Sequence, residues 1–144
     1  MKHLHFPGMD KRIIGRQETA DLPTFGLMNK TVKIDSGAYT SSIDIVNVRL
    51  ENDLLFVLFE KGKEEVLFKK YKVKRVKSSN GIIQERYVIK GTIRLGDIDY
   101  NTPFSLTDRS GMRYPILLGR KLLNKHFLID TSKKNLLQNT GDAS

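Results

Sequence analysis

The stretch "TVKIDSGAYTSSID", residues 31–44, contains the side chains best suited to chemistry. An alternating apolar and polar run is followed by Asp35, Ser36 and Gly37, which predicts a strand that ends in a glycine turn with a carboxylate at its tip. Peptide hydrolysis without a nucleophilic side chain needs a general base to activate water and a general acid to protonate the leaving nitrogen. Two carboxylates about 3 Å apart can do both, because they cannot both ionise and therefore share one proton. Asp35 is either a turn residue or one member of such a pair.

The two residues after Asp35 suit a supporting role in that chemistry. The Ser36 hydroxyl can anchor the loop by a hydrogen bond, and Gly37 can take a positive φ or let a neighbouring backbone approach closely. No second Asp-Ser-Gly occurs in the chain. A carboxylate pair therefore predicts a homodimer in which each chain contributes Asp35 across a two-fold axis. The alternative is a monomer in which Asp35 works with another carboxylate, such as Asp108.

The elements around this motif follow an all-β pattern, with turn residues between short β-type runs. The predicted strands are 30–36, 43–50, 54–60, 65–77, 82–95, 98–107, 113–118 and 127–130. Asn80-Gly81 favours a type I′ turn, so the runs on either side of it are expected to pair as a long hairpin. One short helix is expected to begin at Gly119-Arg120 and to run through "KLLNK". Gly119 is expected to let the chain pass close to the Asp-Ser-Gly loop.

At 144 residues the chain has the length of one domain. We expect residues 13–130 to form it, with a flexible N-terminal segment over 1–12 and a polar tail that frays over 131–144. No apolar run approaches the roughly 20 residues that cross a bilayer, and "MKHLHFPGMD" lacks the apolar core of a signal peptide. We therefore expect a cytoplasmic protein that does not bind membranes, the alternative being a protein whose export signal has been removed.

Several classes of enzyme are excluded by missing motifs. The sequence has no G-x-x-x-x-G-K-[ST] loop for phosphates, no H-E-x-x-H for zinc and no G-x-S-x-G elbow. The absence of cysteine removes disulfides, thiol nucleophiles and thiolate metal sites. The three histidines, His3, His5 and His126, are too scattered to predict a zinc site. We expect neither a metal nor a cofactor, so an enzyme here would have to work with carboxylates.

Charge is the unusual feature of the composition. The 25 Lys and Arg residues exceed the 16 Asp and Glu residues, which gives a net charge of +9 and favours encounters with anions. The densest basic run is Lys69, Lys70, Lys72, Lys74, Arg75 and Lys77. Strand periodicity predicts a half-buried strand here, with Lys70, Lys72 and Lys74 on a solvated face. Tyr71 and Val73 are expected on the other face. Nucleic acid is a less favoured partner than an acidic peptide, because Tyr71 is nearly the only aromatic residue available for stacking.

Two segments resemble a known class of peptidases. "IDSGA" resembles the Asp-Thr/Ser-Gly-Ala motif of aspartic peptidases, and "YPILLGRKLL" resembles the apolar-apolar-Gly-Arg segment and short helix that close a retropepsin lobe. With "IIGRQE", "LP", "ERYVI" and "LTDRSGMRYPILLGR", the chain is similar from Ile13 to Asp130 to a bacterial retropepsin-like family that includes RimB. Some members of this family are called ATP-dependent zinc proteases, but we find no residues here that would hold zinc or ATP.

The resemblance implies a retropepsin-like closed β-barrel or sandwich with one short C-terminal helix, and an aspartic peptidase activity. For the RimB branch it also implies removal of the glutamate tail that a RimK-type ligase adds to a small-subunit ribosomal protein. It assigns catalysis to Asp35, Ser36 and Gly37. It assigns substrate binding to Ala38, Thr40, Arg86, Asp108, Arg109 and Arg120.

Alternatives remain for several of these residues. Arg86, Asp108, Arg109 and Arg120 could instead form structural ion pairs or turns. The chain also has Tyr39 where retropepsins carry an acidic residue that pairs with the arginine of the later Gly-Arg, here Arg120. The favoured function is an aspartic endopeptidase that acts on acidic, glutamate-rich protein tails. The alternative is a catalytically silent basic β-barrel that binds RNA or an acidic protein partner and keeps the Asp-Ser-Gly turn for structural reasons.

Overall fold

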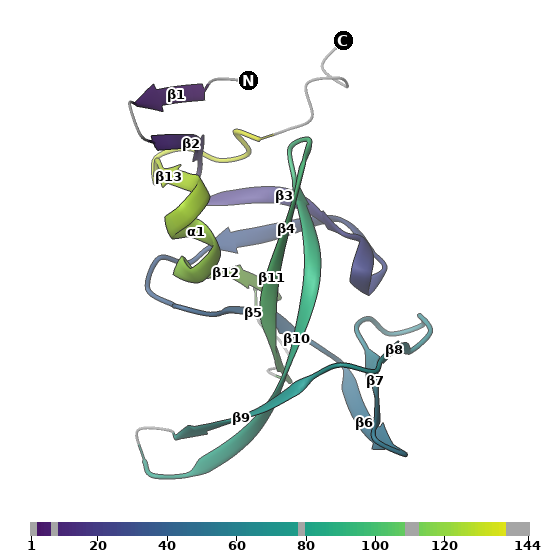
Figure 1. Cartoon of the computed structure of the whole chain (residues 1–144). Helices are drawn as coiled ribbons and strands as arrows, with labels where there is room; N and C mark the ends of the chain where they lie inside the picture. Colours follow the sequence, from purple (N-terminus) through teal and green to yellow (C-terminus); the bar gives the residue numbers. More distant parts are fainter. Residues whose placement is uncertain (1–2, 7–8, 78–79, 109–112, 138–144) are drawn as a thin grey trace.

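The computed structural model describes residues 3–6, 9–77, 80–108 and 113–137, and most of them lie in strands (Figure 1). In the first half of the chain the elements are β1 (His3–Phe6), β2 (Met9–Ile14), β3 (Gln17–Leu22), η1 (Pro23–Phe25), β4 (Leu27–Ile34), β5 (Ser41–Asp44), β6 (Asn47–Glu51), β7 (Leu54–Leu58) and β8 (Val66–Phe68). The second half contains β9 (Lys72–Lys77), β10 (Ile83–Leu95), β11 (Ile98–Thr107), β12 (Ile116–Leu118), α1 (Arg120–His126) and β13 (Phe127–Ile129).

Within the described residues, six strands close into a barrel in the order β11-β5-β12-β4-β3-β10, because β10 also pairs with β11. β9 continues the sheet beyond β10 and is its edge strand. The helix α1 is short and follows β12 directly. The predicted all-β barrel with one short helix near the C-terminal end is confirmed. None of the helices in the described ranges is long and apolar enough to span a membrane.

The strand bounds differ from the predicted runs in two ways. The run 43–50 divides into β5 and β6, and the run 65–77 divides into β8 and β9, because each half joins a different sheet. The strands β1, β2 and β3 are absent from the prediction, and β1 and most of β2 fall in the segment 1–12 that was expected to be flexible. In β3 the inward positions are Glu18, Ala20 and Leu22, so a charged residue interrupts the apolar alternation by which strands are recognised.

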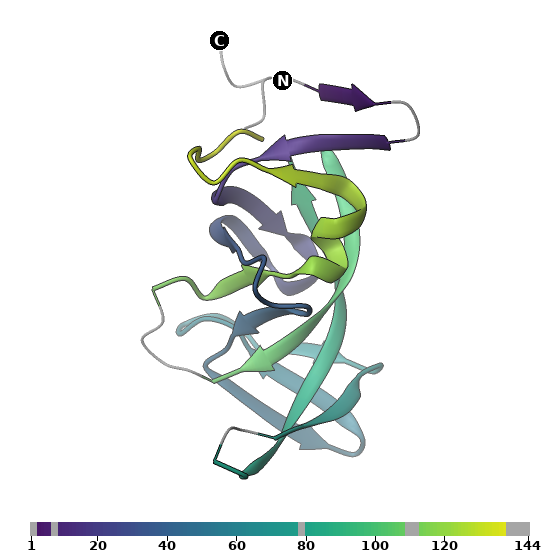
Figure 2. The same cartoon turned by 90° about the vertical axis from the view of Figure 1, so that its left-hand side faces the viewer.

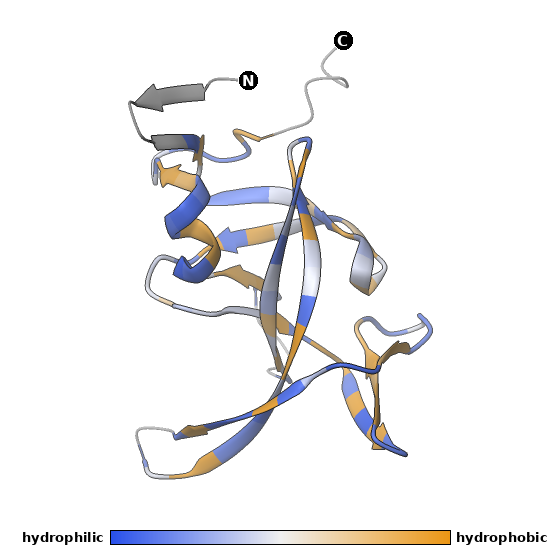
Figure 3. Cartoon of the chain, in the orientation of Figure 1, coloured by the Kyte–Doolittle hydropathy of each residue, from blue (hydrophilic) through white to orange (hydrophobic). Residues whose placement is uncertain are grey.

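β9 and β10 form the expected antiparallel hairpin, with register from Lys72 opposite Val88 to Lys77 opposite Ile83. Residues 78–82 lie between these strands, so the connection is longer than the predicted two-residue turn. The hairpin projects from the barrel, and hydrophilic and hydrophobic residues are interspersed along it (Figure 3). Val73 is 50% exposed and five of the six residues of β9 are exposed, so the prediction of a half-buried strand is wrong. β9 is the edge strand of its sheet.

Phe25 fills the end of the barrel near η1. Its ring stacks on Phe59 at 4.9 Å between centroids and meets Phe104 edge-on at 5.3 Å. Gly91 of β10 makes room for it, because a Cβ at that position would lie 2.3 Å from the Phe25 ring. A glycine inside a strand weakens that strand, and here the close approach of an aromatic ring accounts for it.

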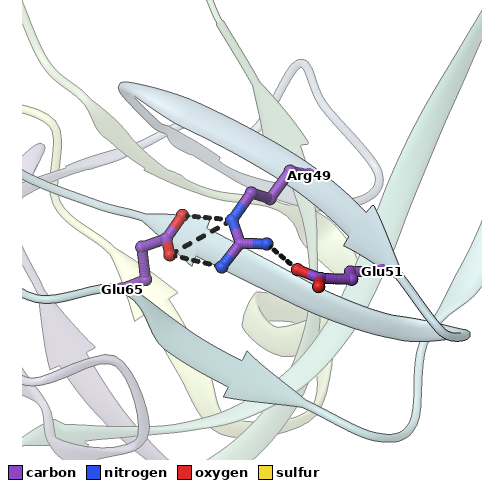
Figure 4. Close-up of polar contacts among 3 residues, drawn as sticks. All are labelled: Arg49, Glu51 and Glu65. Atoms are coloured by element: carbon purple, nitrogen blue, oxygen red, sulfur yellow. Dashed lines mark hydrogen bonds and ion pairs between the residues drawn. The ribbon is translucent and has the colours of Figure 1, made fainter.

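The small sheet β6-β7-β8 is stabilised on one face by Arg49 (Figure 4). The guanidinium donates to both Glu65 oxygens at 2.9 to 3.2 Å, also contacts Glu51, and lies 4.2 Å from the centre of the Phe56 ring. These hydrogen bonds lower the pKa of Glu65. Arg49 thereby connects β6, across β7, to Glu65, the residue before β8. The exposure of these side chains limits their contribution to stability.

Glu18 joins the beginning and the end of the described chain. It is fully buried, and its carboxylate accepts hydrogen bonds from the backbone N–H of Gly15 at 2.8 Å, Leu136 at 3.0 Å and Leu137 at 2.9 Å. Leu137 is buried as well, so the packed part of the chain extends past residue 130, into the segment expected to fray. Beside this connection β2 pairs with β13, and β1-β2-β13 forms a sheet at the opposite end from the β9–β10 hairpin (Figure 2).

We expect Glu18→Ala to lower the free energy of unfolding by about 2–4 kcal/mol, because three buried N–H groups lose their acceptor. Urea denaturation at neutral pH measures this. Glu64→Ala is the matched control, since Glu64 is exposed and forms no ion pair among the described residues, and it should change stability by less than about 0.5 kcal/mol. Equal stability of both variants would contradict the role assigned to Glu18.

Candidate active site

Asp35 is the first residue after β4, where the buried side chains of Val32 and Ile34 hold the strand in the core. Its backbone N–H donates to the Leu118 carbonyl at 2.9 Å. Its Oδ1 accepts from the Gly37 N–H at 3.1 Å, and Oδ2 has no hydrogen-bond partner within the described residues. The carboxylate is therefore oriented on one side and available on the other.

The segment that follows β12 fastens the β4–β5 loop. The backbone N–H of Arg120 donates to the Ala38 carbonyl at 2.8 Å, and that of Lys121 donates to the Tyr39 carbonyl at 2.9 Å. Both donors belong to the first turn of α1, whose N–H groups have no partner within the helix. The N–H groups at the start of the helix and the carbonyl groups of the loop thus satisfy each other's hydrogen bonding. Hydrogen bonds between backbone groups therefore hold most of the loop conformation.

The hydroxyl group that anchors this region belongs to Ser41. It is buried and accepts a hydrogen bond from the Gly119 N–H at 3.0 Å. Ser36 is exposed, and its hydroxyl makes no hydrogen bond within the described residues, so the anchoring role expected of that hydroxyl is wrong for this structure. Sequence reasoning missed Ser41, although its inward position two residues before the buried Ile43 was a usable signal.

Two glycines of the site have different roles. Gly37 does not have a positive φ, and a Cβ there would meet only Asp35 Oδ1 at 3.4 Å. The close backbone approach expected of Gly37 therefore occurs instead at Gly119, where a Cβ would lie 2.6 Å from the Tyr39 carbonyl oxygen and 2.8 Å from the Thr40 carbonyl carbon. The prediction that Gly119 lets the chain pass close to the Asp-Ser-Gly loop agrees with this geometry.

Arg120 contacts the loop rather than a carboxylate. Its Nη1 donates to the Ser36 carbonyl at 3.0 Å, and its guanidinium lies 5.7 Å from the centre of the Tyr39 ring. Tyr39 is 56% exposed. An arginine over an aromatic face is attracted to the ring. Tyr39 thus offers Arg120 a contact at the position where retropepsins have an acidic partner, and Arg120 supports the loop.

The other residues expected to bind substrate are spread around the barrel. Ala38 lies in the fastened loop, and Thr40 lies at the edge of a groove that reaches the base of the β9–β10 hairpin. Arg86 is half-buried on that hairpin, opposite Lys74, and forms no ion pair among the described residues. Arg109 lies outside the described residues.

Asp108 is separated from Asp35 by the length of β12. It lines a groove with Asp44, whose N–H donates to the Pro115 carbonyl before β12, whereas Asp35 contacts Leu118 at the other end of that strand. Three residues of strand span about 10 Å. The structure therefore does not bring Asp35 and Asp108 together. In the described part of the chain, no group of three or more His, Cys, Asp or Glu residues suits a metal ion.

The six-stranded barrel, the carboxylate loop at the end of β4 and the Gly-Arg turn that holds it define a retropepsin-like fold. A family model described as "RimB-like: Retropepsin-like aspartic endopeptidase RimB" matches residues 13–140. The chain therefore belongs to the RimB-like family, as its motifs predicted. That description names neither zinc nor ATP.

Individual relatives have other names. Two proteins called "Probable alpha-L-glutamate ligase", from Shewanella pealeana and Shewanella halifaxensis, are each 36% identical over 143 residues, which cover 92% of this chain and 31% of theirs. The chain thus spans less than a third of the length of these relatives. A crystal structure of the Legionella pneumophila protein Lpg0085, of unknown function, matches with a TM-score of 0.70 and 27% identity, over 88% of this chain and 98% of that one.

We expect Gly119→Ala to lower the free energy of unfolding by about 1–3 kcal/mol, because the added methyl group would displace the backbone at Tyr39 and Thr40. Gly37→Ala is the matched control. Its added methyl group would lie at an ordinary contact distance, and the backbone at Gly37 has no positive φ that would strain an alanine. Thermal unfolding of the two variants measures the difference. A Gly37→Ala protein that is as unstable as Gly119→Ala would contradict this division of roles.

Proposed function

We propose that two copies of this chain form an aspartic endopeptidase that cleaves acidic, glutamate-rich protein tails in the cytoplasm. The observation that carries the proposal is Asp35 at the end of β4, with one carboxylate oxygen oriented by Gly37 and the other open. Ser36 and Gly37 beside it are exposed, so the loop is accessible to a second copy and to a peptide.

The chemistry of a carboxylate pair explains why two chains are needed. No described carboxylate makes contact with Asp35 in one chain, and Asp108 is at the far end of β12. Two Asp35 side chains facing each other would share one proton. The ionised member would take a proton from water, which attacks the peptide carbonyl carbon, and the protonated member would donate its proton to the leaving nitrogen.

The choice of an acidic substrate rests on charge. Residues 69–90 contain eight Lys or Arg residues and one Glu, so this hairpin region carries +7 of the net charge of +9. A concentrated positive field raises the rate of encounter with an acidic chain. The names of the relatives give independent support, because a protein called an α-L-glutamate ligase is one that joins glutamate. A peptidase of glutamate-rich tails fits both observations.

We expect Asp35→Asn to reduce hydrolysis of a glutamate-rich peptide by about 100-fold or more, because the amide cannot act as a general base. The measurement is kcat/KM on the purified protein, with thermal unfolding to show that the fold survives. Asp97→Asn, in the exposed turn before β11, is the matched control and should retain activity. Undiminished cleavage by a folded Asp35→Asn protein would contradict the catalytic role assigned to Asp35.

The proposed dimer makes a separate prediction. Activity per chain should fall on dilution below the dissociation constant of the dimer, and added Asp35→Asn chains should inhibit wild-type chains by forming mixed dimers. A dilution series with light scattering at each concentration tests this. Constant activity per chain together with a monomer mass would refute the shared site.

A further inference from the structure

A groove of about 800 Å³ lies between the catalytic loop and the base of the β9–β10 hairpin. Thr40 and Lys121 border it near the loop, and Lys90 borders it on β10. Phe68 and Ile89, both buried, contribute to its apolar lining. The Lys121 N–H donates to the Tyr39 carbonyl, so a hydrogen bond joins a residue of the groove lining to the loop that carries Asp35.

The charge of this groove has a single sign. The six lysines in its lining are Lys69, Lys70, Lys72, Lys74, Lys90 and Lys121, and the lining includes no Asp or Glu. Among the described residues none of these lysines forms an ion pair. Charges of one sign around one hollow repel each other over a Debye length of about 8 Å at physiological salt. The arrangement therefore favours a bound anion with several charges.

A second groove, of about 510 Å³, provides an internal comparison. Its lining mixes Lys61 with the carboxylates of Asp44 and Asp108, and its Lys30 is paired with Glu60 at 2.6 Å. Positive charge there is balanced by neighbouring carboxylates. Of these two grooves, the lysine-lined groove is the one that lacks such balance.

We propose that the lysine-lined groove is the subsite that holds the acidic side chains of the peptide next to the catalytic loop. The proposal rests on the peptidase function and adds the residues that select its substrate. Lysine suits this task because its ammonium is a compact charge on a flexible stem, whereas arginine binds carboxylates in a fixed two-pronged geometry. A repetitive acidic chain can therefore slide through several registers without losing its contacts.

The position of the groove gives it a function in cleavage as well as in capture. An extended peptide whose acidic residues occupy the groove would continue past Thr40 towards the loop that begins at Asp35. Every second side chain of an extended peptide points to the same side, as Lys72 and Lys74 do on β9. The apolar lining can pack against the methylene groups of glutamate side chains while their carboxylates reach the ammonium groups.

The test measures binding in the full-length Asp35→Asn protein, so that cleavage does not interfere. A fluorescently labelled oligo-glutamate peptide is titrated against this protein and against two derivatives with the same net charge as each other. One derivative carries Lys90→Gln and Lys121→Gln, which are in the groove, and the control carries Lys61→Gln and Lys63→Gln, which are exposed and outside it. We expect Kd to rise about five- to tenfold in the groove derivative and less than about twofold in the control.

Two outcomes would overturn the proposal: an equal rise of Kd in both derivatives, or no rise in either. Binding of a labelled single-stranded RNA that depends on Lys90 and Lys121, with no binding of the peptide, would also overturn it and assign the groove to nucleic acid. If the peptide binds in a groove-dependent way but wild-type protein cleaves nothing, the peptidase function is refuted and the role of the groove in binding acidic peptides is supported. If wild-type protein cleaves the peptide and the groove derivative binds it with an unchanged Kd, the role of the groove is refuted and the peptidase function is supported.

Discussion

The insertion of β12 between β4 and β5 constrains the geometry of the whole site. β12 runs parallel to β4, with Leu118 opposite Ile34, and antiparallel to β5, with Ile116 opposite Ile43. The chain that leaves β4 must therefore pass around the end of β12 before it returns as β5. The residues that follow β12 meet it there, and their N–H groups bind the loop carbonyls. Backbone bonds fix this loop, which explains how Tyr39 can stand where retropepsins have an acidic residue.

Buried polar side chains form hydrogen bonds between segments that are distant in the sequence. These hydrogen bonds specify contacts that apolar packing alone would not. Glu18 binds three backbone N–H groups near both ends of the described chain, and Ser41 binds the N–H of Gly119. Arg12, also buried, donates to the Leu95 carbonyl and the Tyr100 hydroxyl. A buried polar group is costly unless it is hydrogen-bonded, so each of these residues favours one arrangement of its partners over alternatives.

Most of the net charge lies in one segment of the chain, because residues 69–90 carry +7 of the +9. The sheet formed by β1, β2 and β13 lies at one end, and the basic β9–β10 hairpin projects at the other (Figure 2). Among the described basic residues from Lys69 to Lys90, only Arg75 forms an ion pair, with Glu85 at 3.9 Å, and both side chains are strongly exposed. The stability of the fold does not require this excess of positive charge, because exposed like charges repel each other and contribute no apolar packing. The acidic substrate proposed above would account for the charge of the hairpin.

The sequence alone determined the class of fold, the family, the hairpin around Asn80-Gly81, the helix at Arg120 and the position of Asp35 at the end of a strand. These features depend on local periodicity, turn residues and short motifs, which neighbouring residues encode. Only the tertiary structure decided that Glu18 and Ser41 point inwards, that no backbone approaches Gly37 closely, and that Asp108 is remote from Asp35. Each of these depends on a partner far away in the chain, and neither residue type nor spacing reveals which distant backbone will supply it.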